Sequence, residues 1–152
     1  MPELYFEDFK AGDVFDLGTH AMTRERVLSF AREFDPQPFH TDEAAAATSI
    51  YGGLIASGWH TCAVFMRLFV DRLLGRCASL GSPGVDELRW LKPVRPGDVL
   101  RARYTVLAAE PHPRRADRGT LRSLAEVFNQ DGALVMTVRA ANLIAKRNPP
   151  AA

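Results

Sequence analysis

Between Ser57 and Ile144 the spacing of apolar residues changes from a helical to a strand period, and this change constrains the fold more than any other feature. From Ser57-Gly58 to about Leu74, apolar residues lie on most sides of one predicted helix. A helix that is apolar on most sides must be covered by other elements. The stripe that we expect to be covered consists of Trp59, Cys62, Ala63, Met66, Val70 and Leu73.

After Gly75 the chain alternates apolar and polar residues, which predicts strands. The predicted strands are Val85–Lys92, Val99–Glu110, Leu121–Asn129 and Ala133–Ile144, with an earlier one at Val14–Met22. The last two are joined through Asp131-Gly132, a strong hairpin signal. The sequence therefore predicts an α+β fold in a single domain, residues 1–152, in which a mostly antiparallel sheet curls around the long helix.

The composition narrows the class of protein. With 152 residues and a formal net charge of +1, the chain gives no reason to expect a nucleic acid or a membrane as partner. Cys62 and Cys77 lack the spacing of a metal site or disulfide framework, and the N-terminus lacks the pattern of a signal peptide. We therefore expect a cytoplasmic protein without a metal or cofactor. The tail from Lys146 to Ala152 is expected to be disordered.

A stiff corner interrupts the helical patterns of the N-terminal half. One helix is predicted over Arg24–Phe34 after an N-cap at Thr23, and a short second helix over Asp42–Thr48 after an N-cap at Thr41. Each proline of the corner fixes its own φ and pushes the preceding residue out of the helical region, so we predict a non-helical link. This link reads Asp35-Pro36-Gln37-Pro38-Phe39-His40.

Asp35 and His40 are the first candidates for catalysis. A carboxylate and an imidazole on one short segment can hold a single water molecule, one accepting its proton while the other orients it. This requires the corner to fold back, because five extended residues span up to about 17 Å. The alternative is that Asp35 caps or breaks a helix and His40 merely leads into the next one.

The start of the long helix is the second candidate. The first N–H groups of a helix have no internal partner, and Gly58 has no side chain to keep a ligand's carbonyl oxygen away. Such an N–H can stabilise an oxygen that gains negative charge. The alternative is a capping Ser57 and a packing Gly58. His60, on the same turn, has either a direct role or the structural role that is more common for a histidine beside core residues.

The two candidate segments together resemble the MaoC-like family of (R)-specific enoyl-CoA hydratases and acyl dehydratases. The resemblance rests on Asp35-x-x-Pro38-x-His40 followed by Asp42, and on the segment Gly53-Leu54-Ile55-Ala56-Ser57-Gly58 before the apolar helix. It covers the chain from about residue 9 to residue 144. It implies a hot-dog fold, in which the sheet wraps around the central helix, and a homodimer with the acyl pocket near the subunit interface.

The resemblance also implies roles for individual residues. Asp35 and His40 are expected to bind the catalytic water, and the Gly58 N–H to form part of an oxyanion hole for the thioester carbonyl. We expect the substrate to be contacted by Gln37, Pro38, Ser57, Trp59 and His60. Gln37 stands where the family usually has asparagine, and Ser57 where many members have histidine. The implied reaction adds water to a trans-2-enoyl-CoA to give an (R)-3-hydroxyacyl-CoA, or the reverse.

Two other functions remain open. The first is a hot-dog acyl-CoA thioesterase, which commonly places an acidic residue on or near the central helix. Here the first acid of that helix is Asp71, far from its start, which argues against a thioesterase. The second is a non-catalytic subunit that binds acyl-CoA. The pair Asp35 and His40 speaks against it.

Overall fold

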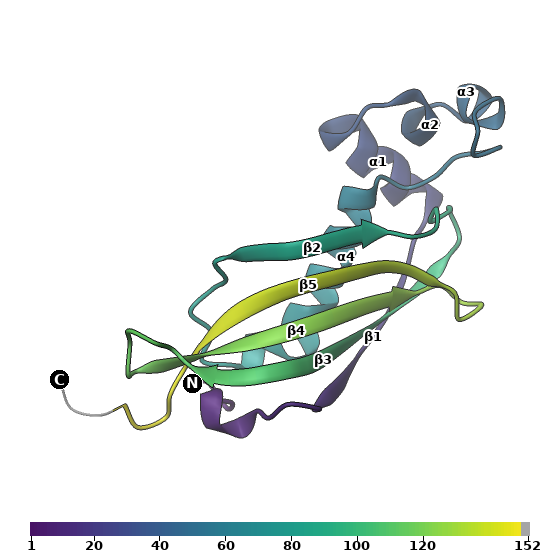
Figure 1. Cartoon of the computed structure of the whole chain (residues 1–152). Coiled ribbons are helices and arrows are strands. Elements are labelled where there is room, and N and C mark those ends of the chain that lie inside the picture. The colour runs from purple at the N-terminus through teal and green to yellow at the C-terminus, as the bar shows by residue number, and fades with distance from the viewer. Residues whose placement is uncertain (150–152) are drawn as a thin grey trace.

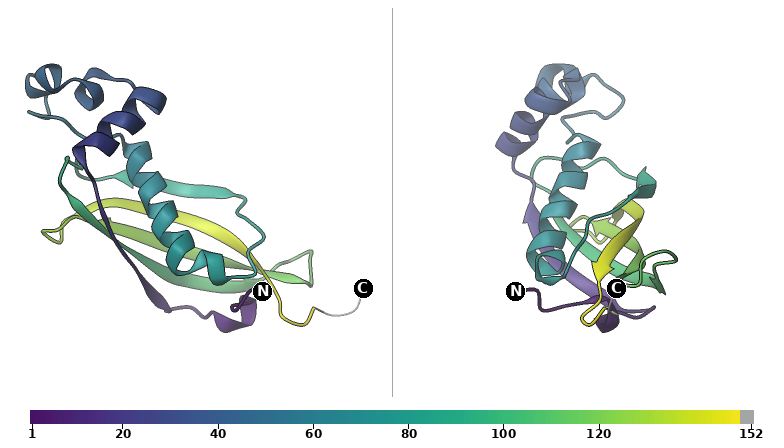
Figure 2. Two further views of the ribbon diagram at one scale, coloured as in Figure 1. Left: turned by 180° about the vertical axis from the view of Figure 1, so that it is seen from behind. Right: turned by 90° about the vertical axis from the view of Figure 1, so that its left-hand side faces the viewer.

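The computed structural model describes residues 1–149 and shows one sheet that curves around one long helix (Figures 1 and 2). The sheet has five strands in the order β1-β3-β4-β5-β2, and all neighbours are antiparallel. The strands are β1 (Val14–Ala21), β2 (Gly84–Trp90), β3 (Val99–Pro111), β4 (Arg118–Phe128) and β5 (Leu134–Ala145). The helices are α1 (Arg24–Phe34), α2 (Pro38–Thr41), α3 (Glu43–Ala47) and α4 (Gly58–Arg72), with 3-10 turns η1 (Phe6–Asp8) and η2 (Leu74–Arg76).

The predicted α+β architecture is confirmed. All five predicted strands form, with ends within a few residues of the expected positions. Asp131-Gly132 makes the turn between β4 and β5, where Gly132 has a φ of 75° and the Asn129 side chain accepts hydrogen bonds from Asp131 N and Ala133 N, both at 3.0 Å. A positive φ suits glycine because it has no Cβ. Helices α1–α3 project together beyond one end of the sheet (Figure 1).

The face of α4 that packs on the sheet differs from the predicted stripe. The buried residues of α4 are His60, Thr61, Val64, Leu68 and Phe69. Trp59, Met66 and Val70, which we expected to be covered, are 58%, 44% and 39% exposed. The sheet covers α4 from one side only (Figure 2), so Trp59, Ala63, Met66 and Val70 are exposed in the single chain, whereas Cys62 and Phe65 are half-buried against the core.

The expected disorder of the tail is wrong for its first residues. Lys146 N donates to Asp117 O at 2.8 Å, and Arg147 N donates to the Glu7 carboxylate at 3.1 Å. The Arg147 guanidinium also pairs with Asp8 at 2.7 Å. These bonds hold the chain after β5 against the N-terminal segment and against Asp117, the residue before β4. Residues 150–152 lie outside the part of the chain that the structure describes.

Tyr104 of β3 contacts both α4 and β5, so its substitution tests how much these buried contacts stabilise the fold. Its ring stacks on Phe69 of α4 with centroids 4.6 Å apart, and its hydroxyl donates to Asn142 Oδ1 at 3.1 Å. Both Tyr104 and Asn142 are buried. Tyr104→Phe leaves the Asn142 oxygen without this donor, so we expect the free energy of unfolding in urea to fall by about 1–3 kcal/mol. Tyr51→Phe is the control, because the Tyr51 hydroxyl has no partner among residues 1–149; equal stability of both variants would contradict the prediction.

Candidate active site

The corner after α1 folds back through one turn of helix. Asp35 is the C-cap of α1, and Gln37 is extended at φ −75° and ψ 145°. The predicted non-helical link is therefore correct only as far as Gln37, because Pro38 begins α2 and its fixed φ suits a first helical residue. The predicted N-cap at Thr41 is also wrong: Thr41 ends α2, and Asp42 caps α3 by accepting from Ala45 N at 3.0 Å.

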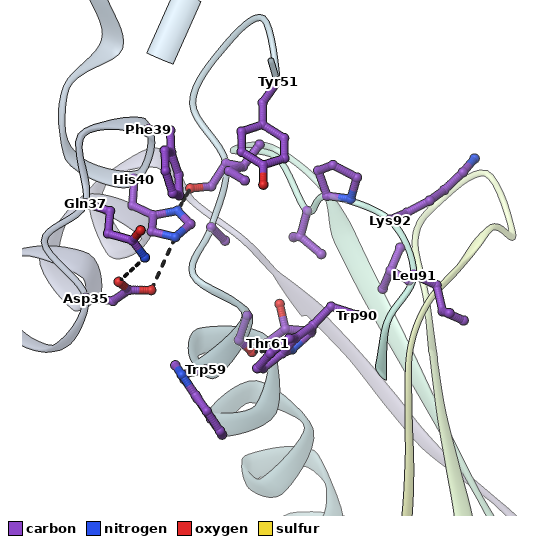
Figure 3. A pocket seen from close by; sticks show the side chains of 16 residues that line it. Asp35, Gln37, Phe39, His40, Tyr51, Trp59, Thr61, Trp90, Leu91 and Lys92 are labelled. Carbon is purple, nitrogen blue, oxygen red and sulfur yellow. Dashed lines mark hydrogen bonds and ion pairs between the residues drawn. The ribbon is translucent and has the colours of Figure 1, made fainter. Parts of the chain in front are cut away.

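This turn brings Asp35 and His40 into direct contact (Figure 3). Asp35 Oδ2 lies 3.2 Å from His40 Nε2. The side chains are only 17% and 6% exposed, so bulk water does not separate them. The alternative in which Asp35 only ends a helix and His40 only starts one does not account for this contact.

A backbone carbonyl fixes the proton on one nitrogen of His40. His40 Nδ1 lies 2.8 Å from Ile55 O. A carbonyl oxygen can only accept, so Nδ1 carries a hydrogen and donates it. Proton exchange at His40 is therefore confined to Nε2, the nitrogen that faces Asp35.

Asp35 is held as a carboxylate. Gln37 Nε2 donates to Oδ1 at 2.8 Å, and Ser57 Oγ donates to Oδ2 at 2.7 Å. Burial raises the pKa of Asp35, but the hydrogen bonds from Gln37 and Ser57 and the charge of His40 outweigh burial and leave that pKa below its ordinary value. Asp35 is therefore ionised at neutral pH and accepts hydrogen bonds.

The N-terminus of α4 lies beside this pair. Ser57 is its N-cap and accepts from Trp59 N at 3.3 Å. His60 N and Thr61 N both bond to Ser57 O, at 3.0 and 3.3 Å. The Gly58 N–H, at the first helical position, has no partner among residues 1–149. It is a free donor at the positive end of a helix dipole.

One cavity of about 380 Å³ joins these groups (Figure 3). Its lining includes the predicted residues Asp35, Gln37, His40, Gly58 and Trp59. The residues that sequence reasoning missed are Phe39, Tyr51, Ile55, Ala56, Thr61, Trp90, Leu91, Lys92, Pro93, Val94 and Val135. Most of these come from the loop before α4 and the connection after β2, and no motif in the sequence ties those two segments together.

Three of the residues that we expected to contact the substrate do not line the cavity: Pro38, Ser57 and His60. Ser57 is fully buried behind the cavity wall and contacts Asp35 instead. Pro38 is exposed at the start of α2 and does not line the cavity.

His60, which we expected to contact the substrate, lines a groove other than this cavity. It stacks on Phe30 of α1, with centroids 4.7 Å apart, and lines a separate groove with His20. Burial, with the nearby charges of His20 and Arg26, lowers the pKa of His60 to about 4. This lowered pKa favours the neutral imidazole, and the ring packs against α1.

The part of the chain that the structure describes contains no group of three or more His, Cys, Asp or Glu side chains that could hold a metal ion. None of its helices is long and apolar enough to cross a membrane.

Comparison with known proteins assigns the family. Residues 9–125 match the family described as MaoC like domain. The chain belongs to this family. Its MaoC-like sheet, wrapped around α4, is the hot-dog fold that the sequence led us to expect. The resemblance of the two sequence segments to the MaoC-like family is thereby confirmed.

Named relatives of this MaoC-like chain include dehydratases. A crystal structure of the MaoC-like dehydratase from Rhodospirillum rubrum is 44% identical, with a TM-score of 0.89 over 95% of this chain and 99% of that one. The 3-hydroxybutyryl-CoA dehydratase of Methylorubrum extorquens is 30% identical over 91% of this chain and 88% of its own length. An uncharacterised Bacillus subtilis protein, YdeM, is 31% identical over 82% and 86%. The chain therefore belongs to a family of hydro-lyases.

Proposed function

We propose that this protein adds water to a trans-2-enoyl-CoA to give an (R)-3-hydroxyacyl-CoA, or catalyses the reverse dehydration. The observation that carries the proposal is the contact of Asp35 Oδ2 with His40 Nε2 at 3.2 Å, in a cavity that is also lined by Gly58, whose N–H is free among residues 1–149. Acid, base and oxyanion donor are the groups that the reaction needs. The relative named 3-hydroxybutyryl-CoA dehydratase supports the same class of substrate.

In the proposed reaction, Asp35 and His40 hold the attacking water. The water oxygen bonds to C3 of the enoyl group, and the C2–C3 π electrons move toward the thioester to form an enolate. The proton that the water loses passes through the Asp35–His40 pair, and a proton from the same face reaches C2 to complete the addition. At His40 this exchange uses Nε2, because Nδ1–H is donated to Ile55 O.

The enolate oxygen is the charge that must be stabilised. The Gly58 N–H is free, lines the cavity and lies at the positive end of α4, a helix of 15 residues. A fixed donor at a forming oxyanion lowers the barrier without having to reorganise. We therefore assign the thioester carbonyl to Gly58.

The proposal is tested by incubating the protein with crotonyl-CoA and following two signals. Hydration removes the absorbance of the conjugated thioester and releases no thiol, whereas a thioesterase releases free CoA that a thiol reagent detects. Asp71, the first acid of α4, pairs with Arg67 at 2.7 Å and does not line the cavity, which argues against the thioesterase. Tight binding of acyl-CoA without either signal would favour the non-catalytic subunit.

Ser57 is expected to set the pH range of this activity. Its hydroxyl donates to Asp35 Oδ2 and helps to hold the pKa of Asp35 below its ordinary value. Removing this donor in Ser57→Ala raises that pKa, so the acid limb of the kcat/KM profile shifts to higher pH. Activity at low pH falls first, while the loss near neutral pH is smaller. The measurement is kcat/KM for crotonyl-CoA across the acid range.

Ser29→Ala, on the exposed side of α1, is the matched control and should leave the profile in place. An unshifted acid limb in Ser57→Ala would show that the Ser57 hydroxyl does not tune Asp35. A shift of the limb to lower pH would contradict the account as well.

We also propose a homodimer and a cytoplasmic location. β2 is an edge strand that pairs only with β5, and edge strands favour pairing with a second copy. The exposed apolar side chains Trp59, Met66 and Val85 lie on α4 and β2. Both cysteines are free thiols, as a reducing compartment allows. A strict monomer in light scattering would contradict the dimer.

A further inference from the structure

Trp90, the last residue of β2, occupies the space that a side chain at residue 58 would need. A Cβ built on Gly58 would lie 2.6 Å from Trp90 Nε1 and still closer to its Cε2. Atoms do not approach so closely without displacement. A side chain at residue 58 therefore requires the indole ring to move, whether or not a ligand is bound.

The same indole is bonded to the first turn of α4. Trp90 Nε1–H donates to Gly58 O at 3.0 Å. Trp90 also meets Trp59 edge to face, with ring centroids 5.1 Å apart. All three residues line the cavity that contains Asp35 and His40 (Figure 3). The edge strand of the sheet thus contacts the helix end that carries the free N–H.

The first turn of α4 is consequently held from two directions. On one side the buried Ser57 hydroxyl donates to Asp35 Oδ2 at 2.7 Å. On the other side Trp90 packs against Gly58 and bonds to its carbonyl. The first contact aligns the turn with the carboxylate, and the second fixes its position relative to the sheet.

We propose that Trp90 is a positioning and specificity-determining residue: it fixes the Gly58 peptide beside Asp35 and His40, and its indole limits the size of the acyl group that fits next to Gly58. This inference rests on the proposed hydratase function. It assigns to Trp90 a role that involves no contact with the transferred proton or the water. Shortening its side chain releases the first turn and widens the cavity at the same place.

The contact is tested without substrate by a double-mutant cycle. Gly58→Ala alone is expected to lower Tm by roughly 5 °C, because the new Cβ displaces the indole. In the Trp90→Leu background the same substitution should cost little, since the ring is gone. Gly53→Ala is the matched control, because a Cβ there meets only the end of the flexible Arg95 side chain, at 3.4 Å. An equal Tm loss from Gly58→Ala in both backgrounds would show that a Cβ at residue 58 does not clash with the Trp90 ring.

The role in turnover is tested with enoyl-CoA thioesters of increasing size. For Trp90→Leu we expect kcat on crotonyl-CoA to fall about tenfold, less than the loss that follows removal of an oxyanion donor. The ratio of kcat/KM for a six-carbon or branched enoyl-CoA to that for crotonyl-CoA should rise several-fold. Trp90→Phe keeps an aromatic ring without the N–H, so it should retain most of the discrimination and lose part of kcat.

These experiments distinguish a failure of the role assigned to Trp90 from a failure of the proposed hydratase function. If the wild type hydrates no enoyl-CoA, the proposed function itself fails. If the wild type is active and Trp90→Leu keeps both the wild-type kcat and the wild-type preference while folded, the role of Trp90 is refuted. A purely structural role would lower the folded fraction and leave the kcat of the folded enzyme and the substrate preference unchanged.

Discussion

Asp35→Asn is expected to lower kcat for the hydration of crotonyl-CoA by about 10³-fold, within the range that general acid–base groups contribute. Asparagine keeps the size of the side chain but removes its charge and its ability to take a proton. Its amide NH2 would also face either Gln37 or Ser57, both of which donate to the carboxylate of Asp35. The measurement is the initial rate at saturating substrate, with circular dichroism to establish that the variant is folded.

Asp86→Asn is the control for this substitution. Asp86 is exposed on β2 and has no ion pair among residues 1–149, so its loss of charge should change kcat less than twofold. A folded Asp35→Asn variant with wild-type kcat would mean that the carboxylate does not take part in the reaction.

His40→Gln is the second substitution with a large expected effect, a loss of about 10²–10³-fold in kcat. The glutamine amide lies near the position of His40 Nε2, so the bond from Nδ1 to Ile55 O at 2.8 Å is lost and circular dichroism must establish that the variant is folded. It has no nitrogen that exchanges a proton near neutral pH. The loss should therefore appear in kcat much more than in KM.

The control for His40→Gln is His112→Gln, in the connection between β3 and β4 and remote from the cavity. It should retain wild-type rates. If His40→Gln raised KM alone and left kcat intact, His40 would be a binding residue and the proposed proton exchange at Nε2 would be refuted.

Much of the fold could be predicted because the apolar patterns of its strands and of its long helix extend over many residues. The strands alternate regularly, and Asp131-Gly132 marks the β4–β5 turn. The face of α4 could not be predicted, because an apolar pattern on most sides does not indicate which side the sheet covers. The sequence does not predict the short helix α2, because Pro38 disfavours helix in Gln37, although proline itself suits a first helical position.

The catalytic candidates were easier to find than their surroundings. Asp35 and His40 are close in sequence, and the two prolines indicated a fixed bend between them. The partners that tune them could not be foreseen: Ile55 O bonds His40 across 15 residues, and Ser57 bonds Asp35 across 22. Trp90 lies 32 residues beyond Gly58, and only the tertiary structure brings its indole onto the start of α4.

We propose above all that this cavity adds water across an enoyl thioester. The most direct measurement is chiral analysis of the acyl-CoA product after incubation of the wild-type protein with crotonyl-CoA. We expect (R)-3-hydroxybutyryl-CoA, with no free CoA and no product from Asp35→Asn on the same timescale. Recovery of unreacted crotonyl-CoA, release of free CoA, or formation of the (S) product would contradict the account.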